Sequence, residues 1–437
     1  MILVIGVNFV LWGTIGLLRV LEEGWTRRRP SRRGDVASRV GVTDVAVLMA
    51  AHNEETVIAD SLEAIAKLVP RNQIHVVSDG STDRTVALAR AAGAAVIETA
   101  GNVGKASALR EAIERFELVD RFTAVLLLDA DTRVDPGYVA AALPQFDDPR
   151  IVAVAGAVRS HWDRHRLSMV GRIVSCHRQR IYTLTQRLMK IGQTWRFTNA
   201  TQIVPGFASM YRTSVLPEIE MDPPGLVIED FNMTFEVYRK RLGKVAFTLD
   251  SVAVTQDPDN LRDYIRQTRR WALGLWQTVR RHRPRPSLFT AMVTLLLLEL
   301  LTSSLLFVLL PILLIVVGLP QLFPPVLNPP LFAAVHSVLA AHLSPASLLV
   351  GLFGPDLLLT CVVAAVERRA WILAYWLAFP LLRILDAALA LYTVPLAWVR
   401  SSGRWTSPAR RSIDAPFPAE GLRAAGSDDE QGSALTA

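Results

Sequence analysis

Cysteine is scarce in this sequence: its 437 residues contain only Cys176 and Cys361. Two cysteines provide no disulfide framework, and no Cys/His spacing typical of a zinc site accompanies them. A fold built on disulfides and a cysteine-based metal site are therefore excluded. The composition fits a domain that folds in the reducing cytosol.

Lysine is scarce as well, because it supplies only five of the 47 basic residues, at a net charge of +7. The arginines concentrate in residues 27–33 and 262–285, and each cluster borders an apolar segment. By the positive-inside rule, both clusters lie on the cytoplasmic side of a membrane. Since no basic-aromatic platform for single strands is present either, we expect no nucleic-acid partner.

Long runs without charge are confined to the two ends of the chain, although hydrophobic residues make up 51% of it. Mean hydropathy is +0.29. Residues 1–20 carry one charge, Arg19, and about twenty helical residues span a bilayer core of about 30 Å. Positive charges follow this run instead of preceding it. This order favours an uncleaved anchor with its N-terminus outside over a cleaved signal peptide.

The second apolar region predicts membrane helices at residues 288–318, 346–366 and 370–398, with an interfacial helix at 331–342. The last run contains Pro380, Arg383 and Asp386, and basic residues follow it, so the number of crossings and the side of the C-terminus stay open. We expect a multi-pass protein of the plasma membrane. Its predicted parts are an N-terminal transmembrane helix (1–22), a cytosolic domain (40–285), C-terminal transmembrane and interfacial helices (286–400) and a disordered tail (412–437).

Between the apolar ends, short apolar runs alternate with helical patterns. The runs predict strands at 44–49, 74–77, 95–97, 124–128, 151–156 and 245–249. Alternating strands and helices form a mostly parallel, doubly wound α/β sheet of the Rossmann type. In such sheets ligands bind at the carboxyl ends of the strands.

Polar motifs follow several of these strands. Asn53 and Glu54 come after the first strand and Asp79 after the second, where each suits contact with a nucleotide. Asp129 and Asp131 follow the fourth strand, and two carboxylates at this spacing can share a divalent cation that holds a diphosphate. Each of these acids, taken alone, also fits a helix cap.

Lys105 follows Gly104 at the start of a predicted helix. The segment is not a P-loop, because alanine stands at 106 where that motif needs serine or threonine. Lys105 can still face a nucleotide from the start of the helix.

Two further motifs lie on helices. Glu229 and Asp230 precede an amphipathic helix, where Asp230 suits a general base and, alternatively, a favourable charge at the helix start. Gln267, Arg270 and Trp271 share one helical face. Arginine suits a diphosphate and tryptophan suits a sugar ring, although basic and aromatic residues also anchor surface helices to membranes.

In this order, the motifs resemble those of the membrane-bound family-2 glycosyltransferases with the D, DxD, ED, QxxRW signature, which include cellulose, chitin, hyaluronan and poly-N-acetylglucosamine synthases. The similarity covers residues 44–285 and the flanking membrane helices. It implies a GT-A-like nucleotide-sugar domain with an attached helical membrane region.

The resemblance also implies roles for individual residues. Asp79, Asn53, Glu54 and Lys105 would contact the nucleotide, and Asp129 and Asp131 would hold Mg²⁺ or Mn²⁺ with the diphosphate. Asp230, next to Glu229, would be the catalytic base. Gln267, Arg270 and Trp271 would grip the diphosphate and the acceptor sugar. Gly206 and Phe207 lie in the acceptor-binding segment, where Pro205 replaces the family's usual serine.

The resemblance implies an inverting, metal-dependent transferase that uses a nucleotide-sugar, with UDP-GlcNAc as the first choice, to extend a β-linked polysaccharide and export it through its own helices. One alternative is transfer of a single sugar to a membrane lipid. Another is a non-catalytic membrane scaffold that binds nucleotide-sugar. The need for a small membrane partner protein and the oligomeric state stay open.

Overall fold

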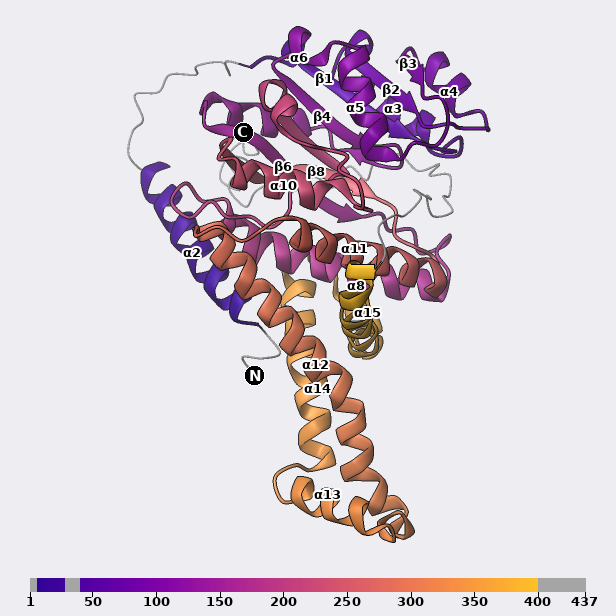
Figure 1. The fold of residues 1–437 in the computed structure, drawn as a ribbon, viewed down its shortest axis with the longest axis vertical. Coiled ribbons are helices and arrows are strands. Elements are labelled where there is room, and N and C mark those ends of the chain that lie inside the picture. Colours follow the sequence, from indigo (N-terminus) through magenta and orange to yellow (C-terminus); the bar gives the residue numbers. More distant parts are fainter. Residues whose placement is uncertain (1–5, 28–39, 400–437) are drawn as a thin grey trace, which may run out of the picture.

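The computed structural model describes residues 6–27 and 40–399 (Figure 1). The predicted tail at 412–437 lies outside this part of the chain. The described residues form a sheet domain with helices on both faces, and a group of apolar helices that extends away from it (Figure 1).

The sheet has eight strands in the order β3-β2-β1-β4-β7-β6-β8-β5. Four neighbouring pairs are parallel and three are antiparallel, so the predicted mostly parallel α/β sheet is confirmed. The strands are β1 (Val45–Ala51), β2 (Ile74–Ser78), β3 (Ala95–Glu98), β4 (Ala124–Asp129), β5 (Arg133–Val134), β6 (Ile151–Ser160), β7 (Ala208–Arg212) and β8 (Lys244–Thr255).

Strand β1 shows why the centre of the sheet is stable, because all seven of its residues are buried. Val47 and Met49 point into the core on one face, and Leu48 points into the core on the other. A strand covered on both sides reads as a continuous apolar run, as this one does. The helices of the domain are α3 (Ile58–Ala66), α4 (Thr85–Ala91), α5 (Lys105–Arg115), α6 (Leu118–Arg121), α7 (Tyr138–Ala142), α8 (Met169–Leu184), α9 (Ile191–Gln193), α10 (Glu229–Arg239) and α11 (Leu261–Arg281).

Three helical segments are long and apolar enough to cross a membrane: Leu288–Leu322, Pro345–Val366 and Ala370–Val399. They correspond to α12 (Leu288–Leu322), α14 (Pro345–Val366), and a 3₁₀ segment (Ala370–Ala378) that continues into α15 (Phe379–Val399). The short apolar helix α13 (Pro330–Ala340) joins α12 to α14 at the end farthest from the sheet (Figure 1). The predicted helices at 288–318, 346–366 and 370–398 are therefore present.

The first apolar segment forms α2 (Val7–Arg27), which ends later than the predicted boundary at 22. Among the described residues, α2 does not belong to the three candidate spans, so its crossing of the membrane stays a prediction. Its start is fixed to α12, because the backbone N–H and the side-chain amide of Asn8 each donate to Glu299 Oε2 at 2.8 Å.

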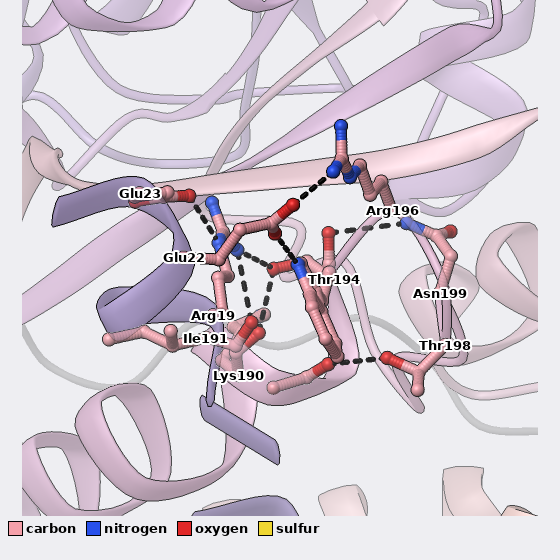
Figure 2. A network of polar contacts seen from close by, with 11 residues as sticks. Arg19, Glu22, Glu23, Lys190, Ile191, Thr194, Arg196, Thr198 and Asn199 are labelled. Atoms are coloured by element: carbon pink, nitrogen blue, oxygen red, sulfur yellow. Dashed lines mark hydrogen bonds and ion pairs between the residues drawn. The ribbon is translucent and has the colours of Figure 1, made fainter. Parts of the chain in front are cut away.

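Figure 2 shows how the other end of α2 is held by residues around α9. Arg19 donates to the carbonyl of Ile191 at 3.0 Å and to Thr194 Oγ1 at 3.1 Å. Glu22 accepts from the indole of Trp195 at 2.8 Å and pairs with Arg196. These partners explain why the helix continues through charged residues that the hydropathy pattern would exclude from it.

Candidate active site

The carboxyl ends of the central strands meet at one edge of the sheet. Ala51 of β1 lies opposite Ser78 of β2, and Ala50 lies opposite Asp129 of β4, with all three strands parallel. The motifs after these strands therefore share that edge, as the sequence predicts.

Lys105 connects two of the motifs. Its Nζ lies 2.7 Å from Asp129 Oδ1 and 2.7 Å from Glu229 Oε1, and it donates to the carbonyl of Gly206 at 3.3 Å. Burial alone would lower the pKa of Lys105, but the charges of the two carboxylates outweigh this effect and raise it well above its usual range. Lys105 therefore keeps its charge and joins the end of β4 to the start of α10.

Asp79 positions the loop that carries Lys105. Its two carboxylate oxygens accept from the backbone N–H groups of Val103 and Gly104 at 2.8 and 2.9 Å. Gly104 has a φ of +95°, which a residue with a side chain rarely adopts. The side chain of Asp79 has no exposed surface. In this conformation it holds the loop, and direct contact with a nucleotide would require the loop to move.

The two predicted residues after β1 differ in exposure. Asn53 is exposed, and its Oδ1 accepts from the backbone N–H of Thr82 at 2.8 Å. Glu54 is only 3% exposed, and its backbone N–H donates to Thr85 Oγ1 at 2.8 Å. Asn53 thus remains accessible at the sheet edge, whereas Glu54 lies beneath the surface.

Asp129 and Asp131 fit a divalent cation. The side chain of Asp129 is 32% exposed. Burial raises its pKa, as do the charges of Asp131 and Glu229, while Lys105 opposes them. A cation would relieve this repulsion. No cluster of three or more candidate metal ligands occurs within 6–27 and 40–399. The donor set therefore suits Mg²⁺ or Mn²⁺ with remaining ligands from a diphosphate and water.

The pKa values of the neighbouring acids Glu229 and Asp230 are shifted in opposite directions. Burial would raise the pKa of Glu229, but Lys105 outweighs it and the pKa falls. Burial and then the charge of Glu229 raise the pKa of Asp230 to about 6. A carboxylate with a pKa near 6 is a base of useful strength at neutral pH.

Gly206 packs tightly between these groups. Its backbone N–H donates to Asp230 Oδ2 at 3.3 Å. A Cβ at this position would lie 3.1 Å from Glu229 Oε1 and 3.3 Å from Lys105 Nζ. Phe207 accepts from the backbone N–H of Asp129 at 2.9 Å, and its side chain packs on the core. Both predicted acceptor residues therefore lie at the site, Phe207 through its backbone.

The predicted motif on α11 divides between two places. Arg270 lines a cavity of about 220 Å³ together with Lys105 and Glu229. Gln267 and Trp271 lie instead against Arg178 of α8. Nη2 of Arg178 is 3.5 Å from Gln267 Oε1, and its guanidinium lies 4.3 Å from the centre of the Trp271 ring.

Three residues near the site are absent from the sequence prediction. Arg178 is 5% exposed and also donates to Thr268 Oγ1 at 2.8 Å. Burial raises the pKa of Asp257 to about 6. Burial lowers the pKa of Lys190 to about 7, although the negative charge of Asp230 acts to raise it. Asp257 follows β8, which ends at Thr255 and not at the predicted residue 249, so the strand-end rule could have found it only with the observed boundary. Nothing in the sequence distinguishes Arg178 and Lys190 from surface cations.

Comparisons with known proteins agree with this architecture. The model of the glycosyltransferase-like family 2 matches residues 43–274. The probable glycosyltransferase YdaM of Bacillus subtilis (strain 168) is 27% identical over 243 residues, which cover 53% of this chain and 54% of that protein. The chain thus spans about half the length of the curated relative it matches.

One solved structure supports the fold, and a second shows a weaker likeness. The mannosyltransferase PcManGT from Pyrobaculum calidifontis, in complex with GDP-Man and Mn²⁺, has a TM-score of 0.51 and 19% identity, covering 88% of this chain and 98% of that one. Glucosyl-3-phosphoglycerate synthase from Mycobacterium tuberculosis has a TM-score of 0.36 and 18% identity over 54% of this chain and 80% of that one. The likeness to PcManGT confirms the predicted GT-A-like α/β fold.

Proposed function

This chain belongs to the glycosyltransferase-like family 2, and we propose that it transfers a sugar from a nucleotide-sugar to an acceptor hydroxyl with inversion at the anomeric carbon. The observation that supports this most strongly is Lys105, which joins Asp129 to Glu229 at 2.7 Å on each side. These two ion pairs place the end of β4, where a diphosphate would bind, close to Glu229 and to the candidate base Asp230.

The donor diphosphate would bind at the strand edge, between Asp129 and the cavity lined by Arg270. Asp129 and Asp131 would hold Mg²⁺ or Mn²⁺, which neutralises charge on a departing diphosphate. Lys105 and Arg270 add fixed positive charge where negative charge grows during the reaction. Asn53 is accessible for the nucleoside, while Glu54 and Asp79 support the loops around it.

Asp230 would accept the proton of the attacking hydroxyl. Its raised pKa keeps it basic enough to take the proton and ionised above about pH 6. Glu229 is paired with Lys105, so its role would be to position the Lys105 ammonium group and to raise the pKa of Asp230, and not to take the proton itself. The acceptor would approach from α11, where it would contact Gln267 and Trp271.

We propose a β-linked polysaccharide as the product, made on the cytoplasmic face and exported through the membrane helices. The reasoning is that α11 packs directly on a candidate span: the Trp276 indole donates to the carbonyl of Ala390 in α15 at 3.2 Å. UDP-GlcNAc is the first donor to test. GDP-Man belongs in the same panel because PcManGT shares the fold.

The test is turnover by protein purified in detergent, supplied with each nucleotide-sugar and Mn²⁺ or Mg²⁺, and followed by nucleotide release and product length. Asp230→Asn should abolish turnover and retain donor binding. Asp250→Asn, an exposed acid on β8, is the matched control and should stay active. Absence of turnover with all UDP-, GDP- and TDP-sugars would refute the proposal, and an active Asp230→Asn would remove Asp230 from its role. A product of one sugar on a lipid would replace the polysaccharide.

A further inference from the structure

A second cavity lies where α8 meets α2, α12, α14 and α15. Its volume is about 240 Å³. Most of its wall is apolar, contributed by Phe9 of α2, Leu300 and Phe307 of α12, and Leu359 of α14. Its charged lining consists of Arg180, Arg383 and Asp386, with His177 beside them. An apolar cavity with a few convergent polar groups is the usual form of a ligand site.

The two arginines share one carboxylate. Arg180 Nη1 lies 2.6 Å from Asp356 Oδ2, and Arg383 Nη1 lies 3.1 Å from Asp356 Oδ1. Asp356 has no exposed surface and does not line the cavity. Arg180 is only 3% exposed, yet its Nε has no hydrogen-bond partner within the described ranges. A buried N–H without a partner is costly, so the hydrogen-bonding capacity of the Arg180 guanidinium is not filled by the described residues around it.

The acidic group in the cavity wall is already engaged. Asp386 Oδ1 accepts from the hydroxyl of Tyr264 at 2.6 Å, and Oδ2 lies 3.2 Å from Nε2 of His177. Both oxygens of Asp386 and both oxygens of Asp356 are bound by neighbours, so the unfilled hydrogen-bonding capacity is that of the Arg180 guanidinium. Such a site selects a head group rich in acceptor oxygens.

We propose that this cavity binds a membrane lipid whose head group is a phosphodiester with one negative charge. The head group would lie at Arg180 and Arg383, and the hydrocarbon chains would run along the walls from Phe9, Leu300 and Phe307. Ionisable groups at membrane depth are expensive unless they serve a ligand or a pathway, and the apolar walls admit a ligand from the bilayer. Asp386 in the cavity wall is hydrogen-bonded to Tyr264 of α11, so the lipid would be linked indirectly to the helix that carries Gln267 and Trp271.

The experiment measures the melting temperature of the full-length protein in a non-ionic detergent, without nucleotide-sugar. The probe is dioctanoyl phosphatidylglycerol, with dioctanoylglycerol, glycerol phosphate and inorganic phosphate as comparison ligands. We expect only the intact phospholipid to raise the melting temperature. Ser303→Leu places a larger side chain in the cavity and leaves every charge in place. This variant should need at least about tenfold more phospholipid for the same rise in melting temperature.

Thr302→Leu is the matched control, because Thr302 is the adjacent residue of α12, is exposed and does not line the cavity. It should respond to the phospholipid as the unmodified protein does. Arg180→Lys keeps the positive charge but loses Nε, and it should also weaken binding. Equal responses of Ser303→Leu and Thr302→Leu would overturn the proposal, as would an equal effect of inorganic phosphate or of dioctanoylglycerol. Because no sugar is transferred in this assay, its failure leaves the proposed transferase activity untouched.

Discussion

Substituting Glu229 by glutamine tests the electrostatics of the proposed base. Glu229 acts on Asp230 in two ways. Its negative charge raises the pKa of Asp230, second only to burial, and it also engages Lys105, whose charge lowers that pKa. Glu229→Gln removes the first effect and strengthens the second, so both changes lower the pKa of Asp230.

The magnitude follows from a shift of roughly one unit, which is typical for the loss of one neighbouring charge. With a pKa of about 6, Asp230 is ionised to about one tenth at pH 5. With a pKa of about 5 it would be half ionised at pH 5, about a fivefold gain in the active fraction. The acidic limb of the rate profile should therefore move to lower pH in the variant, even if its plateau falls.

The assay is nucleotide release at low donor concentration, because the pH profile of kcat/KM reports groups of the free enzyme. The unmodified protein should lose activity as pH falls through about 6. Asp250→Asn should leave the limb in place. A limb that stays fixed or moves upward in Glu229→Gln would refute the coupling between these two acids.

Three further predictions concern neighbouring groups. Lys105→Met leaves Asp129 and Glu229 without their shared cation, so it should lower the free energy of unfolding by about 3 kcal/mol, measured by denaturation in detergent; unchanged stability would contradict the geometry. Chelation with EDTA should stop turnover, and added Mn²⁺ should restore it. The Asp131→Asn variant should need about tenfold more Mn²⁺ for its half-maximal rate, and an unchanged Mn²⁺ requirement would exclude Asp131 as a ligand. Arg178→Lys keeps the charge but loses the planar group over Trp271, so the acceptor KM should rise about tenfold while the donor KM and the pH limb stay fixed. If the acceptor KM and the donor KM rise equally, the role of Arg178 is merely structural.

The sheet illustrates what could be predicted from the sequence. Apolar runs ending in Asp79 and Asp129 predict parallel strands whose ends meet, because burial on both faces imposes a local pattern. The position of β7 has no such pattern. This strand lies antiparallel between β4 and β6, and it brings Gly206 and Phe207 to Asp129 through pairing that only the folded chain determines.

The site shows the same division. Lys105 was predicted to face a nucleotide, and the ion pairs that join it to Asp129 and Glu229 depend on a loop held by Asp79. Arg178 belongs to a basic segment in which any arginine could be the buried one. Its selection depends on how α8 packs against α11, and hydropathy carries no information on that packing.

The two attachments of α2 have a practical consequence for defining the catalytic unit. Similarity to family 2 begins at residue 43, which invites removal of everything before it. A protein shortened in this way would lose Glu22, the acceptor for the Trp195 indole, and Asn8, the donor to Glu299 within α12. The structural unit therefore extends beyond the residues that match the family, because α2 connects the residues before β7 to α12, the first of the candidate membrane spans.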